Sequence, residues 1–519
     1  MRGRPAAPPL ALAALCGVLF LTFLDNTIVS VALADMQKSL KSGVSDLQWI
    51  VDGYMLAFAG LMLSGGTLGD LLGRKLVLLT GVGVFAGGSL IGALAGDSRT
   101  LIAGRVVMGI GAAACEPGTL SLIRQIYPDH RARARALGVW TSVSGISLAA
   151  GPVLGGLLVG WAGWRGIFWF NLVFGLVAFA AAYVTLPESS DRAGRSFDVP
   201  GLLTGALAVT SLTFDVIEGE IAGFGTWWIG ALFAGAAVAT VAFVVVERRS
   251  DDPVLRLDFF RIPAFSSPTA VAFATSFGLF AVFFFTALYL QVVSNFSGRR
   301  IALQFLAMAV AMVIAGIASG RWTAARGPRA PMALGCVLSA GGIFAVDGLL
   351  HPNIALGELA AALALVGFGL GLALVAVTAA VLAIVPAERS GMAASTVNTS
   401  RQLGGVLAVA ILGAVINSRL VSELSRRLGA LGVPPDLQKL VIHAVTHGGL
   451  PADSALAIAT NPVVAAHPGV LGKILSAATT AFGHALHVGL VVAAAVLLAG
   501  AVVSLAAGGR QSAGAPGPA

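Results

Sequence analysis

Two carboxylic acids lie inside long apolar runs of the chain, where charged side chains are rare. Asp25 ends an uncharged run over residues 10–24, and Glu116 precedes Pro117 in a second run. A charge at the centre of a bilayer costs at least about 2.5–3.5 kcal/mol, so such residues are mostly functional or paired. We expect these two acids to carry protons or to bind substrate. The alternative for each is a structural acid that is hydrogen-bonded to a neighbouring helix.

Two arginines and a third acid also lie in apolar stretches. Arg105 precedes Glu116 by 11 residues, close to three helical turns. Both would then share one helix face, about 16 Å apart, and bracket a cavity without pairing directly. Arg401 has no acid beside it in sequence, so we expect it to pair across helices. Both arginines are candidates for proton coupling or substrate binding, against a structural role. Asp52 fits an acid at the membrane interface nearly as well as a functional one.

One short segment combines turn-forming glycines with opposite charges. Its candidate residues are Gly69, Asp70, Gly73, Arg74 and Lys75. Glycine permits a tight turn and the close approach of another helix. The aspartate can pair with the arginine, or it can lie at the N-terminus of a facing helix, where the helix dipole favours negative charge. Such contacts predict a gate that stabilises one conformation. The alternative is a loop that only anchors the topology through its basic residues.

A third group of residues consists of small or helix-bending types within one uncharged run, residues 136–163. They are Gly151, Pro152, Gly155 and Gly156. A proline kinks a helix, and glycines make it thin, so that a neighbouring helix can pack closely. This group therefore predicts a bent, tightly packed helix.

Membrane-spanning helices must position all of these residues. Of the 519 residues, 57% are hydrophobic and only 11% are charged, against about 25% charged in soluble domains. Runs of about 20 apolar residues, the length that spans a bilayer, recur along the chain. A β-barrel, whose strands alternate in polarity, is disfavoured. We predict an all-α polytopic membrane protein whose 14 spans lie near residues 10–35, 47–69, 76–96, 100–126, 135–160, 165–187, 199–217, 225–246, 266–293, 301–320, 330–350, 357–385, 392–417 and 476–508.

The distribution of Lys and Arg predicts the orientation. One set of loops, together with both termini, holds 19 basic residues, and the short loops on the other side hold 6. Positive charge accumulates in cytoplasmic loops, so we expect both termini in the cytoplasm and the long loop 418–475 outside. The same pattern explains the net charge of +8 without nucleic acid. We therefore expect lipid, and no nucleic acid, around this chain.

The chain repeats itself weakly. Gly73 and Gly327 lie in similar loops 254 residues apart, and Pro128 and Pro386 start similar loops 258 residues apart. Such repeats imply a central site and alternating access. We expect a six-helix bundle over residues 1–190, two inserted helices with linkers over 191–262, and a second six-helix bundle over 263–519.

Four motifs resemble those of one transporter family. Leu24-Asp-Asn-Thr-Ile-Val-Ser-Val-Ala-Leu33 resembles the first-helix signature of 14-span drug:proton antiporters of the EmrB/QacA type. The run from Gly65 to Lys75 is similar to the major facilitator loop motif, and Gly104 to Ala113 to its fourth-helix Arg motif. The run from Gly145 to Gly156 resembles the antiporter motif of helix 5. The resemblance implies the major facilitator fold with a 6+2+6 arrangement and proton-coupled export of amphipathic or cationic drugs across the bacterial cytoplasmic membrane.

Other functions remain as alternatives. The chain could transport an endogenous metabolite, or it could be a membrane sensor or an intramembrane enzyme. Neither a P-loop nor a Cys/His cluster occurs in the sequence, so ATP is not the expected energy source and we expect no cofactor or metal. No catalytic motif supports an enzyme. The sequence leaves the oligomeric state open.

Overall fold

The computed structural model describes residues 8–42, 44–188, 198–250, 253–294, 296, 298–351, 356–385, 389–446 and 470–506. Within these ranges the regular structure is helical throughout. The predicted boundary at residues 190 and 191, and residues 447–469 of the long loop, lie outside them.

Helices form at all predicted spans. In the described part of the chain, thirteen helices are long and apolar enough to cross a membrane, by length and composition, and the continuous helix α6 lies at the predicted fifth span. The N-terminal six are α1 (Pro8–Ile28), α3 (Val44–Leu72), α4 (Arg74–Leu94), α5 (Ser98–Ile126), α6 (His130–Ala162) and α7 (Arg165–Thr185), and the inserted pair is α8 (Val199–Ala222) and α9 (Trp227–Arg249). The C-terminal six are α10 (Pro263–Ala281) with its extension, α12 (Gly298–Arg326), α13 (Arg329–Leu349), α14 (Leu356–Ile384), α15 (Ser390–Ala430) and α19 (Val470–Ala506).

Glycines and acidic caps set several helix ends. Gly73 has a φ of 117° between α3 and α4, and Gly163 a φ of 66° after α6, a backbone region that other residues rarely adopt. At the start of α5 the Asp97 carboxylate accepts a hydrogen bond from the backbone N–H of Thr100 at 2.9 Å, as a helix N-cap does.

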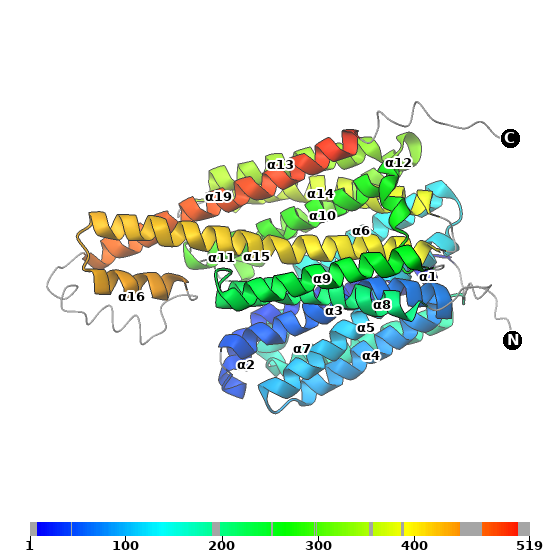
Figure 1. Cartoon of the computed structure of the whole chain (residues 1–519), viewed down its shortest axis with the longest axis horizontal. Coiled ribbons are helices and arrows are strands. Elements are labelled where there is room, and N and C mark those ends of the chain that lie inside the picture. Colours follow the sequence, from blue (N-terminus) through cyan, green and yellow to red (C-terminus); the bar gives the residue numbers. More distant parts are fainter. Residues whose placement is uncertain are drawn as a thin grey trace.

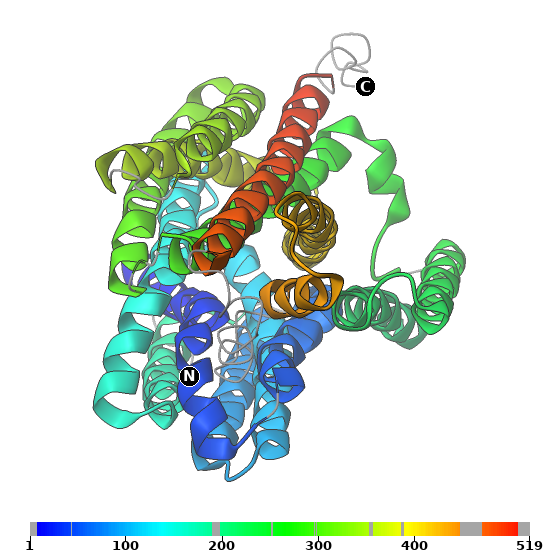
Figure 2. The same ribbon diagram turned by 90° about the vertical axis from the view of Figure 1, so that its left-hand side faces the viewer.

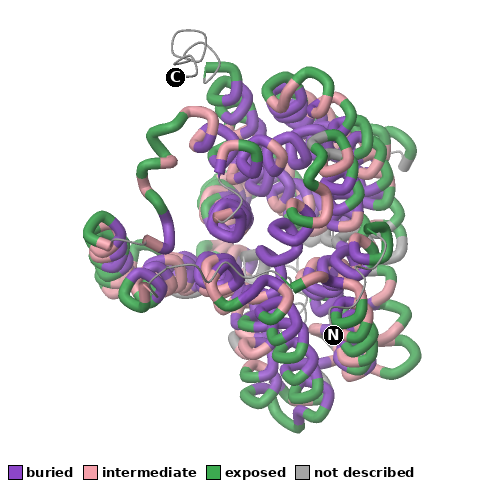
Figure 3. Tube along the Cα trace, turned by 90° about the vertical axis from the view of Figure 1, so that its right-hand side faces the viewer, coloured by how far each residue is buried: buried purple, intermediate pink, exposed green. Residues whose placement is uncertain are grey.

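The helices form two bundles that meet along a central seam. Figure 2 shows the blue-to-cyan helices in one bundle and the green-to-red helices in the other, with α8 and α9 to one side. Across the seam α6 packs on α12, and α3 and α5 pack on α15. The inserted helix α8 contacts both α3 and α15. Figure 3 shows that the buried residues concentrate between the helices, while exposed residues face outward.

The first span, Pro8–Ala32, lies where it was predicted, but it is not one continuous α-helix. The sequence predicted one helix over residues 10–35, but α1 ends at Ile28 and is followed by a short 3-10 helix (Val29–Ala32) and by α2 (Leu33–Leu40). The Asp35 carboxylate accepts a hydrogen bond from the backbone N–H of Trp164 at 3.0 Å. This contact ties α2 to the start of α7.

The long loop is also more regular than expected. The sequence placed its start at residue 418, but α15 continues unbroken to Ala430, and α16 (Pro435–Thr446) folds back beside it (Figure 1). Leu420, Leu424 and Leu428, spaced four residues apart, are buried. Residues at this spacing share one helix face, which α16 helps to cover. The end of the membrane span is therefore not the end of the helix.

The sidedness of the bundle leads to a prediction. The start of α1 and the end of α19 lie at one end of the molecule, and α16 lies at the other (Figure 1). The basic loops predict that the first end faces the cytoplasm, and on that prediction a cytoplasm-active reporter fused after residue 519 should be active. The same reporter inserted at Gly448, outside the described residues, should be silent. Activity at Gly448 would invert the orientation.

Candidate proton and substrate site

Asp25 and Arg105 form a buried ion pair within the first bundle. The Asp25 carboxylate on α1 accepts from Nη1 of Arg105 on α5, and both side chains are at most 1% exposed. The other carboxylate oxygen of Asp25 accepts a hydrogen bond from Nδ2 of Asn171 on α7 at 2.7 Å. The sequence had placed Arg105 and Glu116 together around a cavity. The structure instead turns the arginine toward Asp25.

Further contacts hold this arginine in place. Its Nε donates to the carbonyl oxygen of Ile50 at 2.8 Å, and its guanidinium lies 4.4 Å from the ring centroid of Tyr54. The Tyr54 hydroxyl in turn donates to the Thr22 carbonyl oxygen. Four helices of one bundle thus surround a matched pair of charges. Removing one partner of such a pair costs about 3–5 kcal/mol, because the other charge is left uncompensated.

A second buried acid faces an arginine of the other bundle. Glu116 on α5 is 3% exposed and Arg401 on α15 is 7% exposed. The two side chains interact electrostatically without a direct ion pair among the described residues. Oε2 of Glu116 and Nε of Arg401 have no hydrogen-bond partner there. The expected ion pair of Arg401 across helices is therefore not formed among the described residues, and Glu116 is its electrostatic neighbour on another helix.

Aromatic rings and an amide surround this second pair. The Arg401 guanidinium lies 5.8 Å from the ring centroid of Phe23 and 5.9 Å from that of Trp140. Nε1 of Trp140 is held by the Thr119 hydroxyl at 3.0 Å. Asn398, 1% exposed and three residues before Arg401, has no hydrogen-bond partner for either amide atom within the described part of the chain. A titratable acid and several unpaired polar atoms therefore lie at the seam between the bundles.

Asp70 joins the two bundles at the end where α1 begins. Its carboxylate accepts from the backbone N–H groups of Gly391 and Met392 at 3.1 Å each, at the start of α15. It also forms an ion pair with Arg74 at 2.8 Å. We call this cluster of Asp70, Arg74 and the first turn of α15 the Asp70 latch. Both arrangements foreseen for this aspartate, the arginine pair and the helix cap, occur together.

The other residues of this segment have different contacts. Gly73 forms the turn between α3 and α4, and Gly69 accepts a hydrogen bond from its backbone N–H at 3.2 Å. Nζ of Lys75 donates to the Tyr183 carbonyl oxygen at 2.7 Å, which ties α4 to α7 in the same bundle. Lys75 is therefore not part of the Asp70 latch. Elsewhere at this end, Nη1 of Arg124 donates to the Val385 carbonyl oxygen at 2.7 Å, a further link between the bundles.

The glycines of α6 let α1 approach closely. A Cβ atom on Gly151 would lie 1.9 Å from the Thr27 hydroxyl, and one on Gly155 would lie 2.8 Å from the Ile28 carbonyl oxygen. A Cβ on Gly156 would meet nothing within 4 Å. Pro152 lies between Gly151 and Gly155 in the sequence of α6. Two of the three glycines thus form the packing surface against α1.

This difference provides a matched pair of variants. Gly155→Ala should destabilise the protein by about 1–3 kcal/mol, because a backbone oxygen must move away from the added methyl group. Gly156→Ala should leave stability unchanged. Thermal unfolding of the purified variants measures both effects. Equal melting temperatures for the two variants would show that α1 does not depend on this close contact.

Sequence reasoning missed several residues of the site. Asn171, Tyr54 and Trp140 contact the buried charges but were not candidates. A lone asparagine or tyrosine inside an apolar run is a usable signal, although it is weaker than a charge. Asp52, which was a candidate, lies partly exposed on α3, two residues from the Ile50 carbonyl that Arg105 binds.

Comparison with known proteins decides the family. Residues 15–409 match the family profile described as Major Facilitator Superfamily. The chain belongs to this superfamily. A multidrug resistance protein, Stp of Mycobacterium tuberculosis, is 34% identical over 424 residues, which cover 82% of this chain and 78% of that protein. The tetracenomycin C resistance and export protein of Streptomyces glaucescens is 30% identical over 509 residues, 97% of this chain and 92% of that protein.

Solved structures of this superfamily share the fold. The proton:xylose symporter XylE aligns with a TM-score of 0.58 at 15% identity, over 80% of this chain and 90% of that one. The human organic anion transporter MFSD10 aligns with a TM-score of 0.57 at 16% identity, over 78% of this chain and 92% of that one. The predicted major facilitator fold is confirmed, and the chain is a membrane transporter rather than an enzyme.

Proposed function

We propose that this protein exports drugs or antibiotics across the bacterial cytoplasmic membrane in exchange for protons. The relatives named for multidrug resistance and for tetracenomycin C export support the substrate class. The observation that carries the coupling is the buried Glu116, which faces Arg401 across the seam between the bundles.

Protonation of Glu116 gives this geometry a mechanism. The ionised carboxylate attracts Arg401 and so holds α5 and α15 together. A proton removes that attraction, and an interaction that differs between two conformations shifts their populations. Asp25, already balanced by Arg105, is the second candidate carrier. Its protonation would break the ion pair with Arg105 inside the first bundle.

The Asp70 latch stabilises the conformation in which the two bundles are joined at the end where α1 begins. With the cytoplasm on the side of the basic loops, the latch closes the cytoplasmic end of the seam. The exported compound enters when the latch opens and leaves on the other side when it closes. A proton entering down 100 mV releases about 2.3 kcal/mol, and one pH unit adds about 1.4 kcal/mol. Together these sustain a substrate gradient of several hundred-fold.

A resistance profile tests the proposal. Cells that express the protein and cells with an empty vector are grown with tetracenomycin C, puromycin and an unrelated antibiotic panel. Expression should raise the inhibitory concentration of at least one compound, and that compound should drive proton movement in membrane vesicles. A protein that is correctly inserted but changes neither resistance nor proton flux would contradict export.

A further inference from the structure

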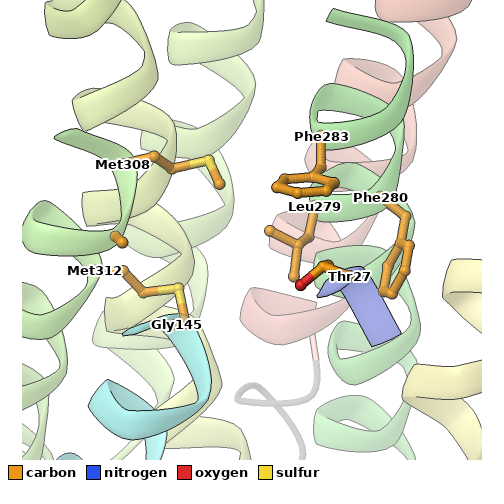
Figure 4. Close-up of a pocket in the computed structure, with 8 residues that line it drawn as sticks. Thr27, Gly145, Leu279, Phe280, Phe283, Met308 and Met312 are labelled. Carbon is orange, nitrogen blue, oxygen red and sulfur yellow. The ribbon is translucent and has the colours of Figure 1, made fainter. Parts of the chain in front are cut away.

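A narrow apolar pocket lies on the seam between the two bundles. The first bundle contributes Thr27 of α1 and Gly145 of α6. The second bundle contributes Leu279, Phe280, Phe283, Met308, Ala309 and Met312. Figure 4 shows the methionines on one wall and the phenylalanines on the other. Both bundles line the pocket, so it changes shape whenever they move against each other.

The walls of this pocket can adjust. Phe283 belongs to a π-helical turn, Val282–Thr286, that interrupts the helix after α10, and such turns are frequent at functional sites. Methionine is unbranched and polarisable, and it is frequent on surfaces that bind many different partners. Gly145 leaves room for one methionine, since a Cβ there would lie 2.8 Å from Cε of Met312. The glycine therefore helps to keep this wall movable.

The pocket offers no counter-charge to a cation. None of its eight lining residues is ionisable. The nearby buried acids already face arginines, Asp25 with Arg105 and Glu116 with Arg401. A cation over the Phe280 or Phe283 ring gains about 2 kcal/mol, which does not offset a burial cost of about 2.5–3.5 kcal/mol or more. An uncharged ring gains from burial and has no such cost.

We propose that this pocket is the subsite for an uncharged aromatic ring of the exported compound. This subsite rests on the proposed export function and restricts its substrates. The protein selects flat neutral compounds over permanent cations. In this conformation the pocket is too small for a ring, so a ring enters only when the methionine wall moves aside, and a whole drug would not fit. This differs from the cationic substrates that the family resemblance had suggested beside amphipathic ones.

Binding of two dyes to the full chain in lipid nanodiscs tests the charge preference. Nile red is flat and uncharged, and ethidium is a flat permanent cation. With binding to empty nanodiscs subtracted, Nile red should bind the wild type with a Kd at least tenfold lower than that of ethidium. Equal or tighter binding of ethidium would overturn the preference for neutral compounds.

Three variants test the position of the subsite. Ala309→Phe fills the pocket, and Phe283→Ala removes one wall without crowding it. Ala318→Phe adds the same ring on the exposed face of the same helix and serves as the control. The first two should raise the Kd for Nile red at least tenfold, and the control should not. If Ala309→Phe does not fold, the Kd of Phe283→Ala for Nile red tests the position of the subsite.

Wild-type binding of Nile red by both pocket variants would place the ring elsewhere and overturn the subsite. The resistance profile of the wild type separates this result from a failure of the export function. Resistance that persists while the pocket variants bind normally would leave export intact and reject only the subsite.

Discussion

Proteoliposomes containing Glu116→Gln should fail to concentrate an exported compound under an imposed pH gradient, while the variant still binds that compound. Glutamine keeps the shape and polarity of the side chain but cannot release a proton. The loss of gradient-driven transport should be tenfold or more, equivalent to about 1.4 kcal/mol or more of lost coupling. Glu358→Gln, an exposed acid in the first turn of α14, is the control and should transport normally.

Asp25→Asn is expected to act differently, because its arginine is buried with it. The single variant leaves Arg105 uncompensated and should lower stability by about 3–5 kcal/mol. Asp25→Asn combined with Arg105→Gln removes both charges and should recover much of that stability without recovering coupled transport. If Glu116→Gln and the folded double variant both concentrate substrate as the wild type does, neither acid carries the coupled proton.

Asp70→Asn should reduce transport tenfold or more while the protein still inserts in the membrane. The carboxylate accepts two backbone N–H groups of α15 and pairs with Arg74, and hydrogen bonds to a charged group contribute about 1.5–3 kcal/mol each. Asparagine keeps one acceptor oxygen but loses the charge that the helix dipole and the arginine favour. The closed state of the Asp70 latch is therefore weakened relative to the open state.

Two measurements test this prediction. Transport in proteoliposomes gives the rate. The distance between spin labels on Leu72 of α3 and Arg326 of α12 reports the separation of the two bundles at this end, and both sites are exposed. In Asp70→Asn the distance distribution should shift toward longer values. Asp258→Asn, whose carboxylate is 78% exposed and pairs only loosely with Arg261, is the control. Unchanged transport by Asp70→Asn would reduce the segment to a topology anchor.

Hydropathy predicted the fold because a bilayer imposes it. Each span needs about 20 apolar residues, and every backbone polar group must be paired within the membrane. The helices therefore follow from the lengths of the apolar runs. Hydropathy predicts the ends of the helices less well, as α15 shows. Hydropathy falls after Asn417, but Leu420, Leu424 and Leu428 continue one helix face, so the helix persists where the membrane span was expected to end.

The sequence identified site residues but not their partners. Asp25, Arg105, Glu116 and Arg401 stand out because a charge in an apolar run is costly. Which of them meet depends on how each helix is rotated about its axis. In a helix that is apolar on nearly all sides, the sequence pattern does not fix that rotation. Asp25 and Arg105 are 80 positions apart, and helical spacing had indicated only that the arginine shares one helix face with Glu116 without pairing with it.

One helix connects three of the features described above. The 41 residues of α15 begin at the Asp70 latch, carry Arg401 along the seam, and continue to the α16 hairpin at the opposite end (Figure 1). At 1.5 Å per residue they extend about 60 Å. In a helix of this length, a small tilt at the Asp70 latch displaces the α16 hairpin by a larger distance. A binder that immobilises the hairpin would thus slow the transport cycle without entering the protein.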